Sequence, residues 1–106
     1  MNYEITPQEL RQLRESHEQL IVLDVREPWE RQTASITGSQ HIVMADVPSR
    51  VQELDPEQHI VVYCHHGVRS LSVTDWLRKQ GYDNTQSMAG GIDRWSLEID
   101  PKVPRY

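Results

Sequence analysis

The stretch VVYCHHGVRS, residues 61–70, places the single cysteine of the chain, Cys64, at the end of an apolar run. The run is rich in β-branched residues, which is typical of a strand buried on both faces. Beyond the stretch, Val73, Trp76 and Leu77 recur at positions i, i+3 and i+4, and this spacing predicts a helix. The cysteine is therefore expected at the carboxyl end of a strand, where the functional sites of parallel sheets gather.

Strand and helix patterns alternate on both sides of this stretch. Thr6 is the expected N-cap of a first helix, because TPQEL combines a threonine, a proline at the first turn and a glutamate for a capping box. Pro28 favours a short helix after the first strand. Strands are predicted over residues 20–25, 40–44, 59–64 and 84–88, and helices over residues 7–16, 46–54, 70–80 and 89–99. The alternation indicates a single α/β domain, residues 1–106, with a mainly parallel central sheet flanked by helices.

Composition and charge exclude several classes of protein. The 106 residues are 37% hydrophobic, and no stretch approaches the roughly 20 apolar residues of a membrane span. The N-terminus lacks the pattern of a signal peptide, and a net charge of −5 disfavours binding to the backbone of nucleic acid. One cysteine forms no internal disulfide, which suits a reducing compartment. We therefore expect a cytoplasmic monomer without nucleic-acid or membrane partners.

The loop after Cys64 can form a site for an anion. If a helix begins near Ser70, residues 65–69 must bend tightly, and several backbone N–H groups converge at the helix N-terminus. Gly67 permits the positive φ that such a bend requires. Arg69 adds a fixed positive charge, and Ser70 is expected to cap the helix through its hydroxyl.

A cysteine at this position has two interpretations. A lone cysteine at the end of a strand is often a small buried apolar residue. A glycine three residues on and an arginine five residues on favour a nucleophile instead, because converging amides and a guanidinium stabilise the thiolate. The same groups would stabilise an anion built on the sulfur, such as a persulfide, a phosphoryl group or an arsenate adduct. Cys64 is therefore the candidate catalytic residue.

Further polar residues flank the candidate site. The adjacent His65 and His66 are expected to point apart, and no second ligand stands at metal-binding spacing, so neither a metal nor another cofactor is expected. The two histidines either shape the rim of the loop or face solvent. Asp24 and Arg26 end the first predicted strand, at the same edge of the sheet as Cys64. Asp24 either hydrogen-bonds amides of the loop or forms an ordinary surface pair with Arg26.

Three motifs together resemble the single-domain, rhodanese-like sulfurtransferases. They are LDVREPWE at Leu23–Glu30, CHHGVRS at Cys64–Ser70 and MAGGIDRW at Met88–Trp95, and they cover nearly the whole chain. The resemblance implies a rhodanese fold and a cycle in which the cysteine takes sulfane sulfur from a small-molecule donor such as thiosulfate. The resulting persulfide passes its outer sulfur to a thiol, cyanide or a protein acceptor.

The resemblance also implies a role for each residue of the site. With Cys64 as the nucleophile, Arg69 binds the anion and the segment from His65 to Val68 supplies amides. Asp24 and Arg26 support the site.

Other functions compete with this one. The C-x4-R spacing is one residue shorter than the C-x5-R loop of related dual-specificity phosphatases, and a smaller cradle favours a sulfur atom over a phosphoryl group. A phosphatase or arsenate reductase is thus the less favoured alternative. The other alternative is a non-catalytic domain that senses oxidants or docks a partner through the loop. Ser35 stands where the family usually has histidine, and we expect it to change local hydrogen bonding only. The tail at residues 100–106 is expected to cover one end of the sheet.

Overall fold

The computed structural model describes residues 2–16 and 19–106 and forms one parallel sheet. In these residues the strand order is β1-β5-β4-β2-β3, and every neighbouring pair is parallel. The strands are β1 (Glu4–Ile5), β2 (Leu20–Asp24), β3 (Gln40–His41), β4 (His59–Tyr63) and β5 (Thr85–Met88). The predicted α/β class with a parallel central sheet is confirmed.

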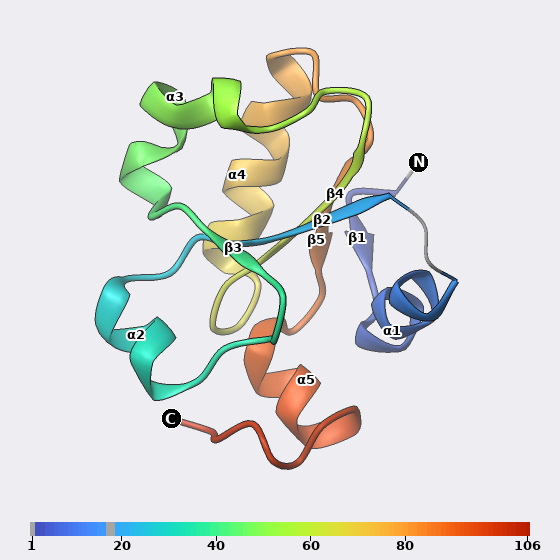
Figure 1. Cartoon of the computed structure of the whole chain (residues 1–106), viewed down its shortest axis with the longest axis vertical. Coiled ribbons are helices and arrows are strands. Elements are labelled where there is room, and N and C mark those ends of the chain that lie inside the picture. The colour runs from blue at the N-terminus through green and yellow to red at the C-terminus, as the bar shows by residue number, and fades with distance from the viewer. Residues whose placement is uncertain (1, 17–18) are drawn as a thin grey trace.

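Helices cover both faces of the sheet (Figure 1). They are α1 (Pro7–Glu15), α2 (Pro28–Thr33), α3 (Val47–Arg50), α4 (Val68–Lys79) and α5 (Gly91–Glu98), with 3-10 turns at Met44–Asp46 and Val51–Glu53. Successive residues of a strand point to opposite faces. Val62 of β4 accordingly packs in a core with α3 and α4, whereas Val61 and Tyr63 pack in a second core with α1 and α5. The domain therefore has three layers, with the sheet in the middle.

The local signals at the helix starts act as predicted. Thr6 caps α1 with its hydroxyl, which accepts a hydrogen bond from the Glu9 amide at 3.1 Å. The Glu9 carboxylate in turn accepts from the Thr6 amide at 2.9 Å, which completes the capping box. The short helix α2 begins at Pro28, also as predicted.

Three elements differ from the sequence-based expectation. The strand predicted over residues 40–44 has only two residues, because its partner β2 ends at Asp24 and offers no longer ladder. The helix predicted over residues 46–54 is broken into one short α-helix between two 3-10 turns. Strand β1 was not predicted, since two residues are too few to show a period.

The carboxyl ends of the central strands lie at one edge of the sheet. Asp24, the last residue of β2, is directly in register with Tyr63, the last residue of β4. The segments that follow these two strands and β5 therefore meet at this edge, which is where the candidate residues lie. Among the described residues, no helix is both long and apolar enough to span a bilayer.

Candidate active site

The sulfur of Cys64 lies at the centre of the loop that joins β4 to α4. Its Sγ accepts hydrogen bonds from the amide of Gly67 at 3.1 Å and from the amide of Ser70 at 3.4 Å. The thiol donates to the Ser70 hydroxyl, also at 3.4 Å. The side chain is almost fully buried, with 1% of its surface exposed. Two backbone amides thus point at one sulfur atom, an arrangement that can accommodate an anion built on it.

Two glycines allow this loop to pack closely against the turn before α5. Gly67 has a φ of +106°, and a Cβ on it would lie 3.3 Å from the amide nitrogen of Gly90. Gly91 has a φ of +62°, and a Cβ there would collide with the His65 carbonyl group. The first amides of α5 also bind the loop, since the Ile92 amide donates to the Cys64 carbonyl at 2.9 Å. The Gly-Gly motif therefore shapes the cysteine loop from outside.

The position of Ser70 corrects one expectation. Helix α4 begins at Val68 with Gly67 as its N-cap, so Ser70 lies inside the first turn and does not cap the helix. Its hydroxyl lies 2.7 Å from the Ser87 hydroxyl on β5 and accepts from the thiol of Cys64. The tight bend ends earlier than predicted because Gly67 adopts the left-handed conformation at the cap. Ser70 therefore contacts the sulfur directly.

Arg69 is bound to a carboxylate that the sequence did not single out. Its two terminal nitrogens donate to the two carboxylate oxygens of Glu30 at 2.7 and 2.8 Å. The Glu30 side chain is only 4% exposed. The hydrogen bonds from Arg69 lower the pKa of Glu30 to about 2, so the carboxylate is ionised across the physiological range. Glu30 is the last residue of the LDVREPWE motif, but nothing in the spacing of that motif indicates that Glu30 pairs with Arg69.

Asp24 and Arg26 form a buried ion pair, which differs from both alternatives considered for Asp24. Arg26 donates to the two Asp24 oxygens at 2.9 and 2.8 Å, and neither side chain is exposed. Arg31 adds a further hydrogen bond to Asp24 at 3.1 Å, and Tyr63 donates to the same carboxylate. Burial would raise the pKa of Asp24, but the hydrogen bonds from Arg26 outweigh it and lower this pKa. In the described residues, Asp24 supports the end of β2 and makes no hydrogen bond to the amides at 65–69.

The segment that carries Ser35 is fixed by Tyr63. The Tyr63 hydroxyl accepts from the amide of Ile36 at 3.2 Å and lies 2.9 Å from the hydroxyl of Ser39. Arg31 donates to the carbonyl of Ser39 at 2.7 Å. Hydrogen bonds to β4 and α2 thus hold this segment around the half-buried Ser35.

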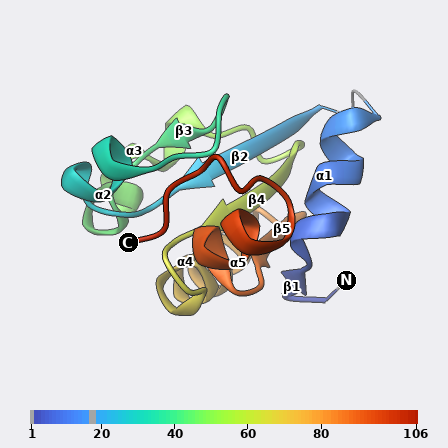
Figure 2. The same ribbon diagram turned by 90° about the horizontal axis from the view of Figure 1, so that it is seen from below.

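Tyr106 is part of the site, although the sequence did not indicate it. The tail after α5 runs back toward α2, so that the C-terminal end lies beside that helix (Figure 2). The Tyr106 hydroxyl donates to Glu30 at 2.7 Å and accepts from Arg26 at 2.8 Å. Its ring stacks on His65 with centroids 3.9 Å apart. Burial raises the pKa of Tyr106 to about 12, and the hydrogen bond to Glu30 adds to this. The tail therefore contacts the loop, beyond the predicted cover for one end of the sheet.

The two histidines differ in environment. Their rings stack with centroids 3.9 Å apart, so they do not point away from each other as expected. His65 is half-buried between His66 and Tyr106, and burial lowers its pKa, with a smaller contribution from the charge of His66. His66 is exposed and its Nδ1 lies 4.0 Å from Asp93. Among the described residues, no group of three or more His, Cys, Asp or Glu side chains is arranged to hold a metal ion.

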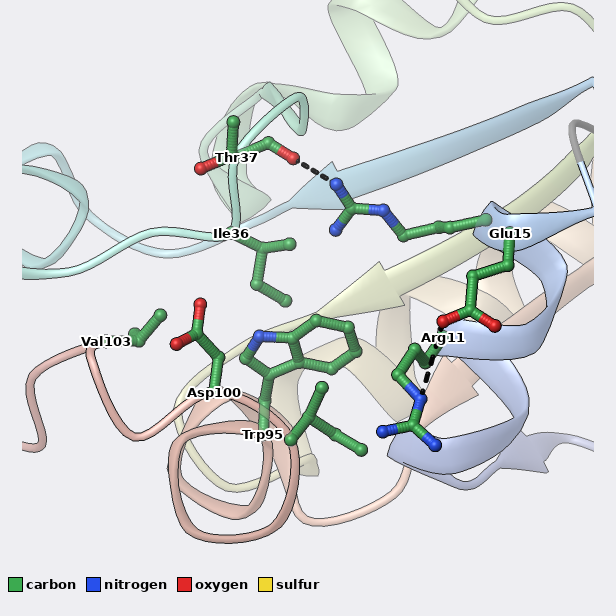
Figure 3. Close-up of a pocket in the computed structure, with 9 residues that line it drawn as sticks. Arg11, Glu15, Ile36, Thr37, Trp95, Asp100 and Val103 are labelled. Atoms are coloured by element: carbon green, nitrogen blue, oxygen red, sulfur yellow. Dashed lines mark hydrogen bonds and ion pairs between the residues drawn. The ribbon is translucent and has the colours of Figure 1, made fainter.

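Two cavities differ in their relation to the loop. One, of about 380 Å³, is bordered by Arg69 together with Val25, Glu27 and Met44. The other, of about 350 Å³, lies between α1, α5 and the segment at residues 36–37, with Trp95 on its wall (Figure 3). No residue of the cysteine loop lines the second cavity. The first is therefore the one that adjoins the candidate site.

Comparison with known proteins yields a consistent set of relatives. The family model for the rhodanese-like domain matches residues 6–98. The putative sulfurtransferase YtwF of Bacillus subtilis is 35% identical over 99 residues, covering 93% of this chain and 95% of the relative. The thiosulfate sulfurtransferase GlpE of Pseudomonas aeruginosa PAO1 is 35% identical, covering 86% and 81%. The chloroplastic rhodanese-like/PpiC domain-containing protein 12 of Arabidopsis thaliana is 36% identical over 89 residues, and the chain spans only 30% of its length.

Solved structures agree with these relatives. A rhodanese-related protein from Thermoplasma volcanium superimposes with a TM-score of 0.85 at 30% identity, covering 99% of this chain and all of the other. The human single-domain sulfurtransferase TSTD1 gives a TM-score of 0.82 at 25% identity, covering 92% and 98%. In both comparisons the likeness covers nearly all of each chain, so the two proteins share the fold of this chain from end to end.

Proposed function

The chain belongs to the rhodanese-like family, and on that premise we propose that it is a sulfurtransferase whose Cys64 carries sulfur as a persulfide. The observation that supports this most directly is the convergence of the Gly67 and Ser70 amides on Sγ. Relatives named as sulfurtransferases match most of the chain, which supports an enzyme of the rhodanese type. Residues 1–106 act as one domain in this proposal.

The proposed cycle has two displacement steps at sulfur. The Cys64 thiolate attacks the sulfane sulfur of a donor such as thiosulfate, the bond to the second sulfur breaks, and sulfite leaves with the bonding electrons. A thiol, cyanide or protein acceptor then attacks the outer sulfur of the persulfide, and the bonding electrons return to Cys64. The amides around Sγ stabilise the negative charge present before and after each step.

The remaining residues of the loop shape and complete the site in this proposal. The segment from His65 to Val68 forms the bend, and Val68 is 77% exposed beside it, where an acceptor can approach. Arg69 supplies the positive charge of the loop. Asp24 and Arg26 hold the end of β2 beneath it.

Intact mass spectrometry tests the proposal. The protein is incubated with thiosulfate, weighed, treated with cyanide and weighed again, in parallel with Cys64→Ser. We expect a gain of one sulfur atom that requires Cys64 and is removed by cyanide. Because the chain has one cysteine, the added sulfur has a single thiol to occupy. If neither thiosulfate nor a persulfide donor adds sulfur to the folded protein, the loop senses or binds and the transfer cycle is wrong.

A further inference from the structure

The positive charge of the cysteine loop is already neutralised within the protein. Arg69 interacts electrostatically with Cys64, and both of its terminal nitrogens are engaged by Glu30. A bidentate pair of this kind holds the guanidinium in a fixed plane and offsets its charge. The charge that an anionic donor meets at this guanidinium is therefore already offset by the Glu30 carboxylate.

Glu30 is itself held in place from other directions. Its carboxylate accepts from the Glu27 amide at 3.1 Å as part of the cap of α2, and from the Tyr106 hydroxyl at 2.7 Å. The side chain is nearly buried, so a carboxylate released from Arg69 would lose a charged partner without gaining water. The neighbouring Arg26 offers no substitute cation, because it is bound to Asp24.

Two classes of sulfur donor, thiosulfate and the hydropersulfides of thiols, place different charges at this site. Attack of a thiolate on thiosulfate brings three negative charges together, and they remain as a perthiolate and a sulfite dianion. Attack on a neutral hydropersulfide, R–S–SH, involves one negative charge: the S–S bond breaks, R–S⁻ leaves, and the protein retains S–SH. The first reaction depends on a free cation, whereas the second needs only the amides around the sulfur.

From these contacts we propose that Glu30 determines donor specificity: it neutralises Arg69, so that Cys64 takes sulfur from hydropersulfides of small thiols in preference to thiosulfate. This inference rests on the proposed persulfide cycle. A small donor is indicated because the Cys64 residue is only 1% exposed at the base of the loop. Glu30 acts through Arg69 and is a positioning residue.

The variant Glu30→Gln tests this assignment. Glutamine keeps the size of the side chain, and its single oxygen can accept from either Tyr106 or the Glu27 amide, but it removes the negative charge beside Arg69. The rates of sulfur gain are measured by mass with thiosulfate and with the hydropersulfide of 2-hydroxyethanethiol, at constant ionic strength. We expect the ratio of the thiosulfate rate to the hydropersulfide rate to rise about tenfold in the variant, as for a unit charge removed near a reacting anion.

Two further variants isolate the cause of such a change. Glu57→Gln removes the same charge from an exposed position outside the site, and the ratio is expected to stay at its original value. In the double variant with Glu30→Gln and Arg69→Gln, the rise in the rate ratio is expected to disappear, because the charge of Glu30 acts by offsetting the Arg69 guanidinium. An unchanged ratio in folded Glu30→Gln, with sulfur still loaded on Cys64, would overturn the inference while the transfer cycle stands. Absence of loading by either donor in the unmodified protein would overturn both.

A binding measurement keeps the inference testable if Glu30→Gln does not fold. Thiosulfate is titrated into Cys64→Ser by calorimetry, where no sulfur can be transferred. Lack of saturable binding at millimolar thiosulfate supports the neutralised site. Saturable binding at submillimolar thiosulfate would show that the anion reaches Arg69 despite Glu30, and the inference would be wrong.

Discussion

Tyr106 joins the C-terminal tail to the two charged groups beside the cysteine loop. Its hydroxyl lies between the Glu30 carboxylate and the Arg26 guanidinium, and its ring covers His65. These contacts are made by a residue that is 76 positions away from Glu30 in the sequence. Only the course of the tail brings them together, and for this reason the sequence pattern did not indicate Tyr106.

Tyr106→Phe is expected to destabilise the fold while keeping the ring stack. The change leaves a hydrogen bond to each of Glu30 and Arg26 unmade in a half-buried setting, which costs about 1–3 kcal/mol in the free energy of unfolding. Urea unfolding measures this loss. Tyr3→Phe is the matched control, because its hydroxyl reaches Asp75 at an exposed position, and we expect about 0.5 kcal/mol or less. Equal losses in the two variants would contradict a structural role for the Tyr106 hydroxyl.

The low pKa of Glu30 predicts a pH dependence of stability. In the folded protein the hydrogen bonds from Arg69 hold this pKa at about 2, below the ordinary 4.5. The ionised carboxylate therefore contributes stability that is fully present above pH 4.5 and is lost as the pH falls toward 2. Urea unfolding at several pH values in this window is expected to show a weaker dependence in Glu30→Gln than in the unmodified protein. Glu57→Gln serves as the control and should follow the unmodified protein; a Glu30→Gln curve parallel to both would refute the assignment.

At the scale of elements, the turn before α5 and the cysteine loop behave as one unit. Gly91 closes the contact, because any Cβ there meets the His65 carbonyl. The α5 amides of Ile92 and Asp93 bind the carbonyls of Cys64 and His65 at 2.9 and 3.2 Å. The spatial arrangement of the loop thus depends on a helix that begins 27 residues after the cysteine.

A comparison of Gly91→Ala with Gly81→Ala separates the effect of losing this contact from the effect of ordinary backbone strain. Gly81 also has a positive φ, +95°, but a Cβ on it would have no atom within 4 Å among the described residues. Gly81→Ala is therefore expected to cost about 1 kcal/mol from backbone strain alone. For Gly91→Ala we expect a loss several times larger in urea unfolding and a reduction of sulfur loading by about tenfold or more, since the loop must shift. Similar behaviour of the two variants would mean that the turn does not shape the loop.

Elements with strong local signals were predictable from the sequence, and elements decided by their partners were not. The capping box at Thr6, the proline at Pro28 and the β-branched runs of β2 and β4 each specify their own conformation. The end of β3 depends instead on where β2 stops. The position of Cys64 followed from its glycine and arginine neighbours, whereas the pairing of Arg69 with Glu30 depends on how α2 lies against α4.

At the scale of the whole molecule, the Asp24 carboxylate connects the sheet to the segments around the site. It ends β2, binds Arg26 and Arg31 on the chain that follows, and accepts from Tyr63 at the end of β4. Arg26 extends these connections to the tail, through Tyr106, and to the Ala34 carbonyl, at 2.6 Å. One buried pair therefore holds together two central strands, α2 and the C-terminal tail.

Asp24→Asn is expected to weaken the entire fold. Arg26 is fully buried, and without the opposing charge its guanidinium is left in the interior with only neutral partners. Removing one member of such a pair costs about 3–5 kcal/mol in the free energy of unfolding, measured with urea. Glu53→Gln, which breaks the exposed pair with Arg50, should lower the unfolding midpoint far less than Asp24→Asn does. Because the buried pair joins several segments, Asp24→Asn should lower the unfolding midpoint in one transition seen equally by tryptophan fluorescence and circular dichroism. Two separate transitions, or a loss no larger than that of Glu53→Gln, would show that Asp24 stabilises the site edge alone and not the whole domain.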